Sequence, residues 1–458
     1  MNDERDFTTS AKIDMNPQRM RTKVSEEQQI KKALFKDDAL TKCLMEKICD
    51  RKNLNLAYKR VKANKGAPGI DGMTVDDMVE FIAKHKERLL ESLLKGSYQP
   101  QPVREVEIPK PGGGMRQLGI PTVIDRLIQQ AILQVLQPIF EAKFSLNSFG
   151  FRPSRSAHQA VKQAQDYVKN GNHIVVDIDL EKFFDRVNHD ILMSKLAKVI
   201  EDKRLLKIIR AFLNAGIMKQ GVCIERVEGT PQGGPLSPLL SNIMLDELDK
   251  ELEKRAHKFS RYADDCNIYV KTLQAGKRVM ESIKQFLETK LKLKVNEGKS
   301  SVSKVTERQF LGFRILQNGK INISKKSEAK VRDVIRVITK RNRGRSLESV
   351  ISELNKRLGG WVNYFKLIDR PEQLRELDSW IRRKLRCYRL KQRKKYHPIV
   401  KFLLGLGVNA RSAYNTAKSG KGWWRLSATP ALHQAMSNAW FEEQGLINLE
   451  RRAMTLNI

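Results

Sequence analysis

The chain has 458 residues, 40% of them hydrophobic, a length and composition that fit roughly three folded domains. Its 86 Lys and Arg residues outnumber its 52 Asp and Glu residues, which gives a formal net charge of +34. Because solubility needs a charge of only about 2 to 8 in a small domain, an excess of this size favours a polyanionic partner, and nucleic acid first.

Five cysteines are scattered along the chain without any Cys-x-x-Cys pair, so neither a disulfide framework nor a structural zinc site is indicated. No apolar run approaches the roughly 18 residues that a membrane span needs, so we expect no membrane partner. We therefore expect a soluble protein that, in a bacterium, would be cytoplasmic and would associate with the nucleoid when it is engaged on DNA.

Residues 1–45 are polar, and we assign no role to this N-terminal arm. From residue 53 to 98 apolar residues recur at helical spacing, interrupted by the glycine-rich loop "NKGAPGIDG" at 64–72. Two short alternating segments between 103 and 121, joined by a Pro-Gly-Gly-Gly tip, predict a β-hairpin. A helix is expected to follow at 123–140.

The most convincing strand is "HIVVDIDL" at 173–180, rich in β-branched residues. Helices dominate from 186 to 256, broken by "GTPQGGPLSP" at 229–238. Two strands flanking "YADD", a helix at 275–291 and a strand at 309–316 complete an α+β region that ends near residue 320.

Composition shifts beyond that point. All five tryptophans follow residue 360, and residues 382–395 contain nine Lys or Arg in fourteen. This pattern predicts a helical, basic C-terminal region that contacts nucleic acid, although such a run could also be only a solvated helix face.

Two groups of acids stand out in this basic chain. Side chains alternate along a strand, so Asp177 and Asp179 share one face, and Asp264 and Asp265 interrupt the second strand-like segment. If the two segments pair, these carboxylates converge and need a divalent cation between them. Two such ions suit nucleotidyl transfer. The alternative is an Asp pair that merely caps a hairpin turn.

Several motifs then occur in a fixed order: "NKGAPGIDG", "IPKPGGGMRQLGIP", "SFGFRPSRSAHQAV", "DLEKFFDRVNHD", "GTPQGGPLSP", "YADD", "LKLKVNEGKS", "FLGFRI" and "GGWVNYF". On these motifs, from about residue 53 to the C-terminus, the sequence closely resembles the bacterial group II intron-encoded reverse transcriptases, or maturases. It looks most like the class C members, which lack an endonuclease.

The resemblance implies a right-hand polymerase of the α+β class, with fingers and an antiparallel palm sheet at 46–322. An α-helical thumb, the maturase domain X, would occupy 323–387, and a basic helical DNA-binding domain 388–458. No endonuclease domain is expected, because no cysteine follows residue 387. A member of this kind would borrow a primer instead of nicking its own.

The resemblance also assigns site residues. Asp179, Asp264 and Asp265 would be catalytic and bind two Mg²⁺ ions, with Mn²⁺ as a possible substitute, and Asp177 remains an alternative to Asp179. The ring of Phe184, five positions after Asp179, would exclude a 2′-hydroxyl. The nucleotide-binding residues would further include Lys110, Arg116, Gln232 and Gly233.

Template and primer contacts are expected at basic residues beside aromatic or glycine-rich segments. These residues are Lys65, Arg152, Arg155, Arg382, Arg383 and Arg386. His158, Trp361 and Tyr364 are interpreted as structural.

The implied function is an RNA-directed DNA polymerase that copies intron RNA during retrohoming and assists splicing. Its partners would be group II intron RNA, an RNA template with a DNA or RNA primer, target DNA and dNTPs. Two alternatives stay open: an RNA-binding splicing cofactor with a dormant polymerase core, and a relative recruited to phage defence or DNA repair.

Overall fold

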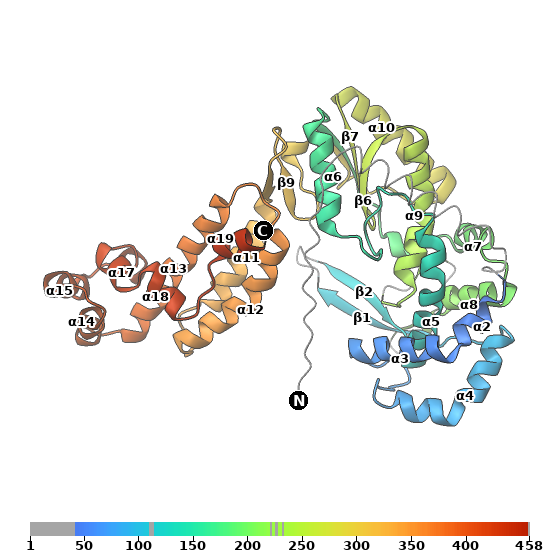
Figure 1. The fold of residues 1–458 in the computed structure, drawn as a ribbon, viewed down its shortest axis with the longest axis horizontal. Helices are drawn as coiled ribbons and strands as arrows, with labels where there is room; N and C mark the ends of the chain where they lie inside the picture. The colour runs from blue at the N-terminus through green and yellow to red at the C-terminus, as the bar shows by residue number, and fades with distance from the viewer. Residues whose placement is uncertain (1–41, 110–113, 220–221, 225–227, 231–232, 457–458) are drawn as a thin grey trace, which may run out of the picture. The chain divides into compact units, whose positions relative to one another are not determined.

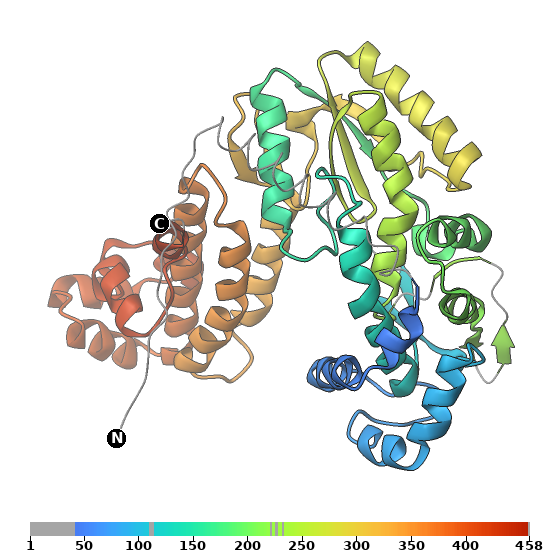
Figure 2. The same cartoon turned by 45° about the vertical axis from the view of Figure 1, so that its right-hand side comes forward.

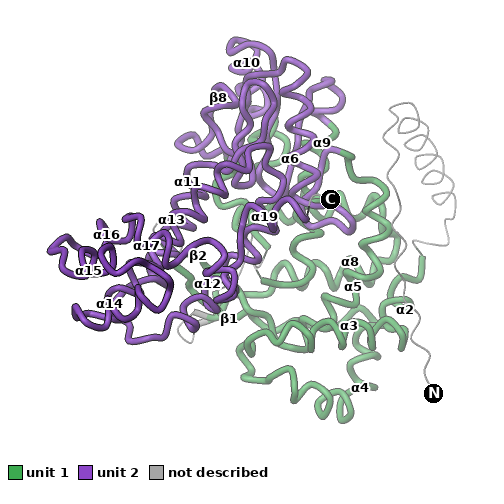
Figure 3. The backbone as a smooth tube through the Cα atoms, turned by 60° about the vertical axis from the view of Figure 1, so that its left-hand side comes forward, with its two compact units in different colours: residues 1–146, 180–250, 286–294 green, residues 147–179, 251–285, 295–458 purple. Residues whose placement is uncertain are grey.

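The computed structural model describes residues 42–109, 114–219, 222–224, 228–230 and 233–456. Most of the N-terminal arm, the hairpin tip with Lys110, and Gln232 lie outside the described residues. The chain divides into two compact units (Figure 3): residues 1–146, 180–250 and 286–294 form unit 1, and residues 147–179, 251–285 and 295–458 form unit 2. The two units are discontinuous in sequence, and the expected domain limits stay a prediction.

Unit 1 combines helices with one mixed sheet, ordered β2-β1-β4-β5. Its helices are α2 (Leu44–Cys49), α3 (Arg51–Asn64), α4 (Met78–Leu94), α5 (Val123–Glu141), α7 (His189–Ala197), α8 (Lys203–Asn214) and most of α9 (Ser237–Lys254), with the short turns η2 (Phe183–Asp185) and η3 (Leu287–Leu291). Its strands are β1 (Val103–Pro109), β2 (Met115–Ile120), β4 (Ile217–Lys219) and β5 (Val222–Ile224).

The hairpin predicted at 103–121 is confirmed. Strands β1 and β2 pair antiparallel from Arg104 opposite Ile120 to Pro109 opposite Met115. The sheet continues through β4 and β5, which lie in a region expected to be helical. These two strands have only three residues each, too few to show a period, so β1 supplies the partner that defines them.

Unit 2 contains an antiparallel four-stranded sheet, ordered β6-β7-β3-β8. Its strands β6 and β7 are labelled in Figure 1, and Figure 2 shows the same fold turned by 45°. The strands are β3 (Ile174–Ile178), β6 (Lys258–Tyr262), β7 (Asp265–Val270) and β8 (Ser301–Lys304). Helices α6 (Ala157–Lys169) and α10 (Leu273–Phe286) cover the sheet, and β9 (Phe313–Ile315) and β10 (Ile321–Ile323) form a separate hairpin after the short turn η4 (Val305–Glu307).

The two faces of this sheet are covered by different helices. On one face Ser260 Oγ donates to the carbonyl of Ala160 in α6. On the other, Gly276 brings α10 so close that a Cβ at this position would lie 2.4 Å from Val302 Cγ1. Val176 and Ile178 are buried on the α10 face, which leaves Asp177 and Asp179 on the α6 face, as the alternation of the strand predicts.

The turn between β6 and β7 has two residues, because Tyr262 pairs directly with Asp265. Ala263 adopts a left-handed φ of 58° there. The turn is braced from two sides: the fully buried Arg261 donates from Nη1 to the carbonyl of Ala263, and the backbone at Gly150 packs so tightly that a Cβ would lie 2.2 Å from Ala263 N. The "SFGF" glycine is therefore required by close packing.

The C-terminal half of unit 2 is helical, as expected. Its helices are α11 (Lys325–Ile338), α12 (Leu347–Phe365), α13 (Glu372–Arg393), α14 (Tyr396–Gly405), α15 (Ala410–Lys418), α16 (Trp423–Leu426), α17 (Pro430–Ala435), α18 (Asn438–Glu443) and α19 (Leu449–Thr455). Helix α13 runs without interruption through residues 387 and 388, where the sequence resemblance sets the end of the thumb, and the thumb and DNA-binding domain limits stay a prediction.

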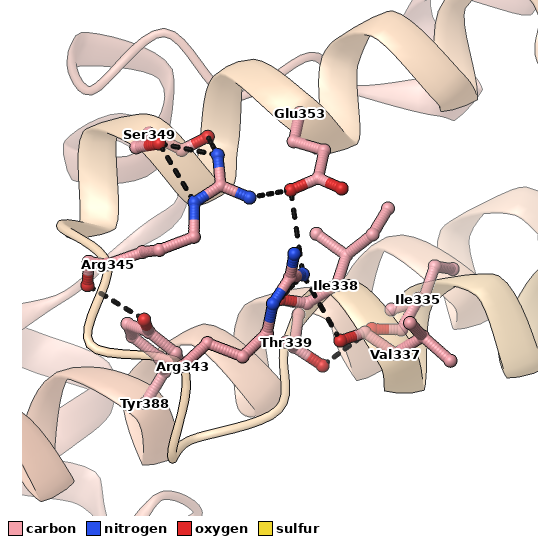
Figure 4. A network of polar contacts seen from close by, with 9 residues as sticks. All are labelled: Ile335, Val337, Ile338, Thr339, Arg343, Arg345, Ser349, Glu353 and Tyr388. Carbon is pink, nitrogen blue, oxygen red and sulfur yellow. Dashed lines mark hydrogen bonds and ion pairs between the residues drawn. The ribbon is translucent and has the colours of Figure 1, made fainter.

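The basic loop between α11 and α12 is anchored by polar contacts (Figure 4). Arg343 and Arg345 both pair with Glu353 of α12. The hydroxyl of Tyr388 donates to the carbonyl of Arg345, 2.8 Å away. Tyr388 is therefore a buried anchor of this loop and not a base-stacking residue of the basic run.

The residues interpreted as structural keep that role. His158 Nε2 lies 2.6 Å from the carbonyl oxygen of Tyr364, and the Tyr364 hydroxyl donates to Leu311. The ring of Trp361 lies 4.8 Å from that of Phe365. All five cysteines are free. Among the helices described, none has the length and apolar character to cross a membrane.

Gly150→Ala tests the bracing of the β6–β7 turn. The added methyl group meets backbone atoms, which cannot rotate away, so we expect a loss of about 1–3 kcal/mol in the free energy of unfolding, measured by urea denaturation. The matched control is Gly359→Ala in α12, where a Cβ meets nothing within 4 Å and helix propensity favours alanine by up to about 1 kcal/mol. Equal effects of the two substitutions would contradict the packing argument.

Candidate active site

Strand pairing brings the acids of the two motifs to one end of the unit 2 sheet. In the β3–β7 ladder Ile178 lies opposite Cys266 and Asp177 opposite Asn267. Extending this register by one step sets Asp179 opposite Asp265, and residues opposite each other share a face. Asp264 occupies the adjoining turn. The pairing predicted for the two segments is therefore present, and it brings Asp179, Asp264 and Asp265 to the same end of the sheet.

The proximity of these groups is visible in their electrostatics. Partial burial, and then the carboxylates of Asp264, Asp177 and Asp179, raise the pKa of Asp265 to about 6, although part of its side chain remains exposed. Burial also raises the pKa of Asp179, and the negative charge of Asp264 raises it further. A group of acids that raise one another's pKa values is typical of a site completed by a cation.

Two basic side chains offset part of this charge. Lys299 Nζ lies 3.7 Å from Asp179 Oδ1, and Arg308 Nη1 lies 3.8 Å from Asp177 Oδ2. Both ion pairs are long and partly exposed, so they are weak. Within the described residues no three acidic, histidine or cysteine side chains are close enough to enclose a metal ion as they stand. The carboxylates lie near one another, but they do not surround a common position at which a metal ion would bind.

A loop that the sequence-based prediction did not assign holds Asp179 in place. The hydroxyl of Ser300 accepts from the backbone N–H of Asp179 at 3.0 Å and lies 3.3 Å from its carbonyl oxygen. The N–H of Asn296 donates to the same carbonyl at 2.8 Å. The motif "LKLKVNEGKS" contains these residues and was the available signal, but their contact spans more than a hundred residues of chain.

Unit 1 holds the residues predicted to bind the nucleotide. Phe183 is buried, and its ring contacts the half-buried ring of Phe184 edge-on at 5.3 Å. The N–H of Thr230 donates to the carbonyl of Phe184 at 2.6 Å. A Cβ on Gly229 would lie 2.9 Å from the carbonyl oxygen of Asp185, and Gly229 has a φ of 90°, so this position requires glycine. The glycine-rich loop is thus packed against the backbone of the Phe-Phe turn.

The same loop reaches the hairpin of unit 1. Gly233 has a φ of 131°, and a Cβ there would lie 2.7 Å from the carbonyl oxygen of Gly119 in β2. Arg116 is exposed on β2, opposite Ile108. Phe184, Gly233 and Arg116 therefore belong to connected elements of one unit. Lys110 and Gln232 lie outside the described residues.

Two of the predicted template contacts are corrected by burial. Arg152 is 5% exposed and donates to the carbonyl of Ser148 at 2.7 Å. Arg386 is 3% exposed and donates from Nε and Nη2 to the carbonyl of Met436. Their guanidinium groups satisfy backbone carbonyls inside the protein, because a buried carbonyl without a partner is costly. These two residues hold loops and do not face a nucleic acid.

The other predicted contacts keep some access to solvent. Lys65 is exposed at the left-handed C-cap of α3. Arg155 lies over the ring of Phe149. Arg382 and Arg383 are half-buried on α13, and Arg383 stacks on Trp424 at 4.0 Å.

Comparison with known proteins agrees with this arrangement. Residues 108–315 match the family described as reverse transcriptase (RNA-dependent DNA polymerase), and residues 328–402 match the group II intron, maturase-specific domain. Protein YkfC of Escherichia coli K12 is 35% identical over 296 residues, 56% of this chain and 78% of that protein. The group II intron-encoded protein LtrA of Lactococcus lactis is 31% identical over 339 residues, 59% of this chain and 56% of LtrA. This chain therefore aligns with little more than half of LtrA.

Among solved structures, a partial Cas6-RT-Cas1–Cas2 complex is 27% identical over 54% of this chain and 42% of that chain, with a TM-score of 0.36. Telomerase from Candida albicans is 14% identical over 80% of this chain and 66% of that chain, with a TM-score of 0.40. Neither score is high enough to add to the assignment.

Acids at one end of an antiparallel sheet, in a chain with a glycine-rich hairpin and a Phe-Phe turn, define a template-directed polymerase. The two family matches make the class more specific: the chain belongs to the group II intron-encoded reverse transcriptases that carry a maturase domain.

Ser300→Ala tests the support of Asp179. Loss of the hydroxyl removes a bond worth about 1 kcal/mol, so we expect roughly five- to tenfold slower primer extension on an RNA template. Ser300→Thr retains the hydroxyl and should stay within about twofold of the unsubstituted protein. If both variants extended primers at the unsubstituted rate, Ser300 would have no positioning role.

Proposed function

We propose that this protein copies RNA into DNA at a site formed by Asp179, Asp264 and Asp265. The observation that carries the proposal is the β3–β7 register, which sets Asp179 opposite Asp265 with Asp264 in the adjoining turn. Carboxylates at the ends of rigid strands suit a reaction in which the reacting groups must be held in a defined geometry.

The donor set fits divalent cations, and Mg²⁺ best. Hard carboxylate oxygens are the ligands that this ion prefers, and it usually shares its coordination with substrate phosphates. A pair of bound ions would supply charge for activating the primer 3′-hydroxyl and for stabilising the departing pyrophosphate. The raised pKa values of Asp179 and Asp265 support the fit, since a cation would relieve the repulsion that raises them.

The protein's own residues would orient the substrates. Arg116, with Lys110, would neutralise the triphosphate of a dNTP, because a guanidinium fork pairs with two phosphate oxygens at once. Phe184 would lie under the sugar and exclude a 2′-hydroxyl. The backbone near Gly233 would approach the base pair, with Gln232 donating to it.

The nucleic acid partners follow from the charge and from the relatives. LtrA is named as a group II intron-encoded protein, and we infer that this chain likewise binds its intron RNA and assists splicing. RNA template, DNA or RNA primer and target DNA are the further partners, with Lys65, Arg155, Arg382 and Arg383 as candidate contacts. The bacterial cytoplasm is the proposed location.

Asp264→Asn combined with Asp265→Asn should abolish primer extension on an RNA template, a loss of at least about a thousandfold. Both changes remove charge while leaving shape, so RNA binding measured by filter retention should remain within about threefold. Extension at the full rate would show that the metal site is elsewhere. Splicing assistance by an unsubstituted protein that never extends a primer would instead favour a dormant polymerase core.

Replacement of the metal gives an independent test. Extension should be absent with excess EDTA and return when Mg²⁺ or Mn²⁺ is restored, whereas Ca²⁺, which tolerates longer and more irregular coordination, should support binding without rapid transfer. The measurement is single-turnover extension at a fixed concentration of free metal. Extension that is insensitive to EDTA would contradict divalent-metal catalysis.

A further inference from the structure

The C-terminal helices form a groove that the polymerase chemistry does not use. Helices α14 and α15 pack against each other and bound a space of about 1230 Å³. Its walls include Arg393, Tyr396, His397, Lys401, Phe402 and Tyr414. None of its lining residues is acidic.

Two tyrosines give this groove flat aromatic surfaces. Tyr396 is 37% exposed and Tyr414 is 47% exposed, although large rings are usually buried in a protein's core. Their ring planes differ by only 22°, with centroids 6.5 Å apart. The two rings therefore present faces of nearly one orientation, as successive stacked bases need.

The basic groups of the groove are not committed to acids. The side chain of Arg393 has no hydrogen bond or ion pair with any described residue, and its guanidinium lies 4.9 Å from the centroid of the Phe402 ring. Its Nε is buried without an acceptor. Lys401 is exposed at the same groove. A guanidinium that is held against a ring and has N–H groups without acceptors can donate hydrogen bonds to phosphate oxygens.

We propose that this groove binds unpaired nucleotides of a single-stranded nucleic acid. Bases would stack on Tyr396 and Tyr414, while Arg393 and Lys401 neutralise the flanking phosphates. Unpaired bases expose the faces that stacking requires, whereas a duplex hides them and would need only charge. An apolar peptide would offer Arg393 only neutral carbonyl acceptors and would leave the positive charges of Arg393 and Lys401 without an anionic partner.

This inference rests on the proposed function only in taking nucleic acid as the partner. It assigns recognition of unpaired base faces to a region for which the sequence resemblance implies DNA binding without indicating how the bases are contacted. The test measures binding alone, without dNTPs. A negative result would therefore reject the groove without affecting the polymerase proposal, and a failure of primer extension would leave the groove proposal intact.

Binding is measured by fluorescence anisotropy of a short labelled oligouridine or oligothymidine on the full chain, saturated beforehand with an unlabelled template–primer duplex. Tyr414→Ala and Tyr396→Ala should each weaken binding roughly 5- to 150-fold. Tyr414→Phe should stay within about twofold, whereas Tyr414→Leu, apolar but not aromatic, should resemble the alanine variant. Met454→Ala, an equally exposed apolar residue on α19, is the control and should have no effect.

The unsubstituted protein provides a second measurement that no folding defect can affect. Oligonucleotides carrying 4-thiouridine (RNA) or 4-thiothymidine (DNA) should cross-link to Tyr396 or Tyr414. The oligonucleotide that cross-links in higher yield shows whether the groove binds RNA or DNA. Three results would overturn the proposal: cross-links confined to other regions, equal affinity for the annealed duplex, or self-association that Tyr414→Ala abolishes, which would make the groove an interface between copies.

Discussion

The constraint on which the rest of the site depends is the crowding of like charges at one end of a sheet. Asp177, Asp179 and Asp265 share a face because antiparallel pairing requires it. Burial and the neighbouring carboxylates raise the pKa of Asp265, and burial and the charge of Asp264 raise the pKa of Asp179. Repulsion between these carboxylates does not stabilise the fold. A bound cation and polyanionic substrates would relieve that repulsion and so account for the cluster. The excess of positive charge elsewhere serves the same substrates.

Much of the surrounding architecture holds these acids in position. Gly150 and Arg261 brace the turn that carries Asp264, and Ser300 and Asn296 hold the backbone of Asp179. The same logic applies in unit 1, where Gly229 allows the glycine-rich loop to pack on the Phe-Phe turn. Glycines and buried hydrogen bonds fix backbone positions, and the exposed side chains are left free for chemistry.

The sequence predicted the local features well, because they depend on short-range patterns. Alternation identified β3 and the face of its acids, glycine and proline marked the hairpin of β1 and β2, and helical spacing gave α5 closely. The ordered motifs predicted the family, which the two family matches confirm, and the pairing of β3 with β7 sets Asp179 opposite Asp265.

The errors arose where tertiary contacts decide the outcome. Strands β4, β5 and β8 are too short to show a period. Arg152 and Arg386 were expected at the surface because they lie in basic or aromatic segments, but each satisfies a buried carbonyl. The support of Asp179 by Ser300 joins distant segments, and composition cannot reveal it. The most direct test of the central claim is anomalous diffraction from crystals soaked with Mn²⁺ in the presence of template–primer and a dNTP. The account predicts manganese between Asp179 and the Asp264–Asp265 pair; manganese elsewhere, with Asp179 still paired to Lys299, would contradict it.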